Sequence, residues 1–198
     1  MAIYIDATFV HTRRDQQVSK EAYYTVLGMK EDGTREVLSV VNHPTEGASN
    51  WLHLFEQLKL RGLEEVDLVI SDGLKGIENA VNQGFPGALH QFCVVHLMRT
   101  ISAEFPLKKR KEINEELKEV FPMETETKKQ VDAFVAYKAF ITKYEKQYPG
   151  LKSYKADRYI HYFTYLNYPA ELQRMIYSTN WIERLNRDHK KVLKMRKK

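Results

Sequence analysis

Apolar and polar residues alternate near the start of the chain, with the period of two that is typical of a β-strand with one buried face. Ile3 and Ile5 carry this alternation, and Asp32-Gly33 further on favours a tight turn. The polar segment 11–20 predicts a loop or the end of a hairpin. Because the connections are short, we expect an antiparallel meander. Its three strands are expected at 2–10, 23–29 and 35–41.

After the meander, helical spacing alternates with two compact apolar segments. Ser49 is a candidate N-cap and Gly62 a candidate stop signal for the first helix. Asp72-Gly73 ends the next apolar segment. The remaining expected elements are a helix at 49–61, a strand at 66–71, a helix at 75–83, a strand at 88–92, a helical region at 95–177 and a last helix from 180 to the end.

This order of elements predicts an α/β fold with a mixed sheet, because three antiparallel strands precede strand–helix–strand crossovers. It is the order of a ribonuclease H-like fold. The helical region is too long for a loop, so we expect an all-helical insertion with its own core. The predicted division is a first part of the core at 1–96, the insertion at 97–177 and the last core helix at 178–198. Prolines are expected to break the insertion near Pro106, Pro122, Pro149 and Pro169.

Composition indicates a globular protein, with 43% hydrophobic and 29% charged residues among 198. There is no apolar run of the roughly 20 residues that span a membrane, and the N-terminus does not read as a signal peptide. A single cysteine, Cys93, suits a reducing cytoplasm. Residues 184–198 hold eight Lys or Arg and one acidic residue, Asp188. This segment carries a charge of +7, whereas the whole chain carries +5, so the rest of the chain sums to −2. The basic character is therefore local, and it suggests a polyanion partner or a solvated helix end.

Two aspartates occupy positions where a carboxylate needs an explanation. Asp6 lies between apolar residues in the middle of the first strand, which is costly unless the carboxylate is paired or binds a metal. Asp72 ends a buried strand, where ligands of α/β sheets gather. The structural alternatives are an outward-facing Asp6 and an Asp72 that caps the next helix.

Glu183 lies near the start of the last helix. Asn180 three residues earlier forms a possible capping box with it, which needs no catalysis. Alternatively, Glu183 shares a helix face with amide and basic side chains, which suits a metal site that faces a phosphate backbone. The candidate DNA-binding residues are Asn186, Arg187, Lys190, Lys191 and Lys194.

Together Asp6, Asp72 and Glu183 are the kind of set that two-metal phosphoryl transfer requires. Mg²⁺, or Mn²⁺ in its place, prefers carboxylate oxygens. We therefore expect two such ions held by these three residues. The pair Cys93 and His96 is too small for a structural zinc site, so we expect it to serve packing or hydrogen bonding. The aromatic and basic residues at 154–168 predict either a DNA-gripping surface or a tyrosine-rich core.

Five short motifs resemble those of the catalytic domain of Mutator-type transposases of bacterial insertion sequences. In family order they are YIDA at 4–7, GASNWL at 47–52, SDGLKG at 71–76, CVVH at 93–96 and STNWIERLN at 178–186. The resemblance implies a ribonuclease H-like core, an Asp-Asp-Glu triad at Asp6, Asp72 and Glu183, and a helical insertion before the Glu. It also implies DNA as partner, both transposon ends and target, and a homo-oligomer in the active complex.

The family carries further sequence on both sides of this region, so we expect this chain to be a fragment of such a transposase. Two other interpretations stay open. One is a ribonuclease H-like nuclease that only hydrolyses DNA. The other is a truncated, inactive remnant that binds DNA or a full-length transposase.

Overall fold

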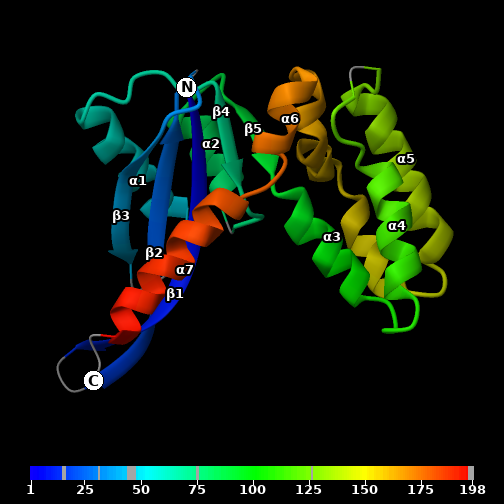
Figure 1. The fold of residues 1–198 in the computed structure, drawn as a ribbon, viewed down its shortest axis with the longest axis horizontal. Helices are drawn as coiled ribbons and strands as arrows, with labels where there is room; N and C mark the ends of the chain where they lie inside the picture. The colour runs from blue at the N-terminus through cyan, green and yellow to red at the C-terminus, as the bar shows by residue number, and fades with distance from the viewer. Residues whose placement is uncertain (15–16, 31, 44–47, 75, 126, 196–198) are drawn as a thin grey trace. The chain divides into compact units, whose positions relative to one another are not determined.

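The computed structural model describes residues 1–14, 17–30, 32–43, 48–74, 76–125 and 127–195 (Figure 1). These residues form two compact units. Unit 1 comprises residues 1–90 and 179–198, and unit 2 comprises residues 91–178. The sequence boundary that we placed after residue 96 lies inside a helix, whereas the first unit ends at His90.

Unit 1 contains a sheet whose first two strands are longer than the alternating pattern suggested. β1 (Ala2–Arg14) and β2 (Gln17–Met29) pair antiparallel from Ala2↔Met29 to Arg14↔Gln17. Of the two alternatives given for 11–20, the hairpin end is confirmed and the loop is not, because the strand pairing continues to Arg14↔Gln17. Strand pairing satisfies the backbone groups without needing a buried face, so polar side chains can continue a hairpin into solvent.

The turn predicted at Asp32-Gly33 is confirmed. The Asp32 carboxylate accepts a hydrogen bond from the backbone N–H of Thr34 at 2.8 Å, and Gly33 adopts a φ of 80°, which suits glycine. The turn leads into β3 (Arg35–His43), which pairs antiparallel with β2 and shows an irregularity at Val26/Leu27. The predicted meander is therefore present.

The sheet is mixed, as the element order predicted. Its strand order is β3-β2-β1-β4-β5, and β4 (Leu68–Ser71) runs parallel to β1. The other elements that belong to or begin in unit 1 are α1 (Ala48–Leu60), α2 (Ile77–Gly84), β5 (Leu89–Phe92) and α7 (Asn180–Met195).

Helices cover both faces of this sheet. Trp51 of α1 stacks on Tyr24 of β2 with ring centroids 3.9 Å apart. The next residue of β2, Thr25, points to the opposite face and bonds to Asn186 of α7. Figure 1 shows α7 crossing this second face, in front of β1 and β2. The last helix is therefore held against the strand that carries Asp6.

Unit 2 is helical and is built around stacked aromatic rings. Its helices are α3 (Val94–Ala103), α4 (Arg110–Val120), α5 (Gln130–Tyr144), the 3₁₀ helices η1 (Pro149–Lys155) and η2 (Asp157–Asn167), and α6 (Ala170–Ile176). Phe121 stacks on Phe163 at 4.7 Å, with Tyr137 close to both rings. The four prolines named above lie between or at the start of these helices, as expected.

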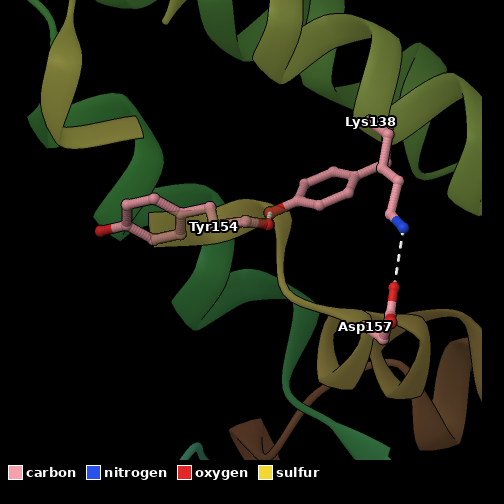
Figure 2. Close-up of polar contacts among 4 residues, drawn as sticks. Lys138, Tyr154 and Asp157 are labelled. Carbon is pink, nitrogen blue, oxygen red and sulfur yellow. Dashed lines mark hydrogen bonds and ion pairs between the residues drawn. The ribbon is translucent and has the colours of Figure 1, made fainter. Parts of the chain in front are cut away.

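The aromatic segment 154–168 belongs mainly to this core. Phe163 and Tyr165 have no exposed surface, and Tyr162 is 8% exposed, so these rings are not available to grip DNA. The segment is tied to α5 by two contacts. The Tyr137 hydroxyl donates to the Tyr154 carbonyl at 3.0 Å. Lys138 pairs with Asp157 at 2.8 Å, and Figure 2 shows this ion pair. No helix among the described residues is both long enough and apolar enough to cross a bilayer.

Candidate active site

Asp6 faces inward in the middle of β1. Its side chain is 8% exposed, and it lies directly opposite Thr25 on β2. One oxygen, Oδ2, accepts a hydrogen bond from the amide nitrogen of Asn186 at 2.6 Å. The outward-facing alternative is therefore wrong, and the carboxylate is buried with a specific donor, as a functional carboxylate would be.

Asp72 directly follows β4, the strand that runs parallel to β1. The parallel ladder of β1 and β4 ends with the pair Ile5↔Ser71, so Asp6 and Asp72 are the residues that follow this pair. Neighbouring strands lie about 4.8 Å apart. Asp6 and Asp72 are thus the next residues along the two paired strands, and Asp72 is half-buried.

A threonine that we did not predict brings Asp72 and Glu183 together. The Thr179 hydroxyl lies 3.0 Å from Oδ1 of Asp72 and 3.4 Å from Oε1 of Glu183. The distance between these two carboxylate oxygens is therefore at most the sum of the two distances. Thr179 is fully buried, and a hydroxyl has only one proton to donate, so the two acceptors share it.

The position of Glu183 does not match the predicted capping box. α7 begins at Asn180, so Asn180 is the first helical residue and Thr179 precedes the helix. Glu183 is half-buried and its backbone N–H bonds to the Thr179 carbonyl at 3.0 Å. A Ser-Thr pair directly before a helix, as at 178–179, was the sequence signal that could have drawn attention to Thr179.

Asn186 is placed differently from our expectation. We expected it on the side that faces DNA, but it is 3% exposed and faces the sheet. Its amide nitrogen donates to Asp6, and its amide oxygen accepts from the Thr25 hydroxyl at 2.7 Å. This geometry favours a role in positioning Asp6. Thr25 was missed because a threonine within a strand carries no sequence signal for function.

A second polar pair supports the strand end at Asp72. The Ser71 hydroxyl lies 2.8 Å from Nε2 of His90 and donates to the Asp72 carbonyl at 2.8 Å. Both side chains are buried. This pair ties β4 to β5 immediately before Asp72.

The basic residues of α7 lie mostly at the surface. Arg184 and Arg187 are exposed, and Lys191 is exposed and pairs with Asp188 at 2.9 Å. Lys190 is half-buried and lines a cavity of about 380 Å³. The Lys194 side chain, residues 196–198, and Gly47 and Lys75 of the motifs above lie outside the described residues.

Cys93 and His96 flank the start of α3. Cys93 is a buried free thiol directly before this helix, and His96 is half-buried in its first turn. The backbone N–H of the intervening Val94 bonds to the Tyr177 carbonyl at 3.1 Å. The packing role expected for the Cys–His pair stays a prediction.

The chain matches known transposases over its whole length. The family model described as "Transposase, Mutator family" matches residues 1–198. The transposase for insertion sequence element IS1201 of Lactobacillus helveticus is 35% identical over 196 residues, which are 97% of this chain and 51% of that protein. A probable transposase for an insertion sequence element of Corynebacterium diphtheriae is 31% identical, with 98% of this chain and 56% of that protein covered. The chain thus spans about half the length of the curated relatives that it matches, and it belongs to the Mutator family of transposases.

Proposed function

We propose that this chain is the catalytic region of an insertion-sequence transposase with a ribonuclease H-like core, which cuts DNA at transposon ends and joins it to target DNA. One observation carries the proposal: a single Thr179 hydroxyl lies within hydrogen-bonding distance of both Asp72 and Glu183. Asp6 and Asp72 each directly follow the last residue pair of the ladder between β1 and β4. Gathering carboxylates in this way is unfavourable without a cation, because like charges repel.

The donor chemistry of the site fits divalent magnesium or manganese. Asp6, Asp72 and Glu183 offer carboxylate oxygens, which are the ligands that such hard ions prefer. We propose that these three residues hold two ions. When bound, the ions supply charge stabilisation for the attacking and leaving oxygens of an in-line displacement.

Other residues of the chain position the carboxylates and bind the DNA backbone. Thr179 and Asn186 hold the carboxylates in place. The basic side chains of α7 neutralise the DNA backbone, which gives affinity without reading sequence. These are the candidates named from the sequence except Asn186, namely Arg187, Lys190, Lys191 and Lys194.

The reaction has two displacements at phosphorus. In the first, a water oxygen forms a bond to phosphorus and the bond to the 3′ oxygen breaks, so the transposon end receives a 3′-OH and the flanking DNA of the same strand keeps a 5′-phosphate. In the second, this 3′ oxygen forms a bond to a target phosphorus, and the target strand leaves with its own 3′-OH. We propose DNA, as ends and target, and a homo-oligomer as the partners of this reaction.

A strand-transfer assay tests the proposal. The protein is incubated with a pre-cut duplex end and a supercoiled plasmid in Mg²⁺ or Mn²⁺, and products are resolved on gels. We expect joined product from the chain and none from Asp6→Asn, Asp72→Asn or Glu183→Gln. The control is Asp132→Asn, which changes an exposed aspartate of unit 2 in the same way.

Each other result selects a different function. Metal-dependent nicking without joining would favour a nuclease that only hydrolyses. Metal-independent DNA binding with neither reaction would favour an inactive remnant.

A further inference from the structure

We propose that Asn186 is a positioning residue that sets the orientation of the Asp6 carboxylate, and that Thr25 in turn fixes the Asn186 amide. This inference rests on the proposed function, because it concerns one of the proposed metal ligands. It assigns to α7 a second task besides carrying Glu183.

Three side chains from three elements form a continuous hydrogen-bonded chain. Thr25 of β2 donates to Oδ1 of Asn186 at 2.7 Å, and Nδ2 of Asn186 donates to Oδ2 of Asp6 at 2.6 Å. Thr25 is fully buried, and Asn186 and Asp6 are 3% and 8% exposed. Charge-assisted hydrogen bonds of this kind are short and roughly twice as strong as neutral ones.

The carboxylate at one end sets the direction of this chain of hydrogen bonds. An ionised Asp6 only accepts hydrogen bonds, so the amide nitrogen of Asn186 must face it. The amide oxygen then faces Thr25, whose hydroxyl must donate. Asn186 is thus held in one of its two amide orientations, and it presents a donor to Asp6 at a constant position.

The Asn186 side chain borders a cavity, so neighbouring atoms do not enclose it on every side. Asn186 and Thr25 both line the cavity of about 380 Å³ between the sheet and α7, whose wall also includes Thr8 and Lys190. A side chain that borders open space keeps rotational freedom unless hydrogen bonds restrict it. We infer that the bonds to Thr25 and Asp6 supply this restriction.

The sequence offers a matched pair of threonines for the test. Thr25→Val removes the donor to Asn186 while keeping the shape of the side chain. Thr8→Val makes the same change on the neighbouring strand, at a buried residue on the same sheet face that lines the same cavity. Thr25→Ser keeps the hydroxyl, and Asn186→Leu removes the donor to Asp6 while keeping the branched shape of the side chain.

The first measurement is Mn²⁺ affinity of the 198-residue chain, followed by electron paramagnetic resonance, together with the melting temperature in EDTA. We expect Asn186→Leu and Thr25→Val to bind Mn²⁺ about tenfold or more weakly, the range seen when the partners of metal ligands are removed. Thr25→Ser should recover most of the affinity, and Thr8→Val should leave it unchanged. Equal affinity in Asn186→Leu and the unaltered chain would overturn the proposal.

The second measurement needs no metal. A double-mutant cycle of Asp6→Ala and Asn186→Leu, measured by urea unfolding in EDTA, reports whether the two side chains interact. We expect the double variant to be less destabilised than the sum of the single variants. Additive effects would refute the positioning role. If the unaltered chain binds no Mn²⁺, the proposed function fails, and the cycle still decides the role of Asn186.

Discussion

Replacing Asp72 by Asn tests how the three carboxylates of the site share their charge. Asn keeps the size of the side chain and retains an oxygen that can accept from the Thr179 hydroxyl, which lies 3.0 Å from Asp72. The substitution removes one negative charge beside Glu183, whose Oε1 lies 3.4 Å from the same hydroxyl. We expect metal-dependent cleavage to be lost while the fold stays intact.

Two opposing effects set the change in stability. A hydrogen bond to a charged acceptor contributes about 1 kcal/mol more than one to a neutral acceptor, and this difference is lost. Two like charges about 4 Å apart repel by about 1–4 kcal/mol between bulk water and a partly hydrated site, a larger separation gives less, and part of this cost is relieved. Because both carboxylates are half-buried, the lower value applies. The free energy of unfolding should therefore change by less than about 1 kcal/mol, or about 2–4 °C in melting temperature.

Added Mg²⁺ separates the variant from the unaltered chain. An ion that binds only the folded state stabilises it by about 2.7 kcal/mol at a free concentration of 100 times Kd. The melting temperature of the unaltered chain should rise with Mg²⁺, and that of Asp72→Asn should rise much less. Thermal melts in EDTA and in Mg²⁺ are run beside a nicking assay. Retained nicking, or a fall in stability of more than about 3 kcal/mol in EDTA, would refute the reasoning.

Further predictions concern unit 2, alkaline pH and DNA. Tyr137→Phe should lower the free energy of urea unfolding by about 1 kcal/mol, because the half-buried Tyr154 carbonyl loses its donor; an unchanged midpoint would contradict this. Burial raises the pKa of Tyr4 to about 12, whereas an unfolded tyrosine ionises near 10. The unfolded chain then releases this proton first, so stability should fall as pH rises from about 10 to 12, by up to about 1.4 kcal/mol per unit, and less steeply in Tyr4→Phe. Alanine at three lysines should reduce the salt dependence of duplex binding by up to about three units in slope, measured by titration at several salt concentrations, and an unchanged slope would exclude them as phosphate contacts. The three lysines are Lys190, Lys191 and Lys194.

Local sequence patterns predicted much of the fold. The alternation at Ile3 and Ile5, the turn at Gly33 and the strand that ends before Asp72 each depend on neighbouring residues, so each could be located from the chain alone. The start of the last helix at Asn180 was also predicted. The longer hairpin and the 3₁₀ helices were missed, because strand pairing and the packing of unit 2 override the local preference there.

It was harder to predict which side of α7 faces the sheet, because the sequence of this helix allows more than one row of residues to be buried. We grouped Asn186 with Glu183 and the basic residues, although it also follows Ile182 by four residues. Ile182 is fully buried, so its stripe faces the sheet and carries Asn186 with it. Thr25 could not be recognised from the sequence, and the Ser-Thr pair before α7 marks Thr179 only as a possible helix cap, since the roles of both threonines depend on contacts with residues more than a hundred positions away.

The placement of Glu183 also depends on how the chain leaves and re-enters unit 1. Unit 1 stops at His90 and resumes at Thr179, so α7 returns only after the whole of unit 2. Closing a flexible loop of that length costs conformational entropy. In unit 2 the backbone N–H of Val94, near its start, bonds to the carbonyl of Tyr177, near its end, at 3.1 Å. Because the aromatic core of unit 2 holds these two ends together, the chain emerges close to where it left. The helical insertion is thereby a closed unit, and Thr179 and Glu183 can reach Asp72 without ordering a long loop.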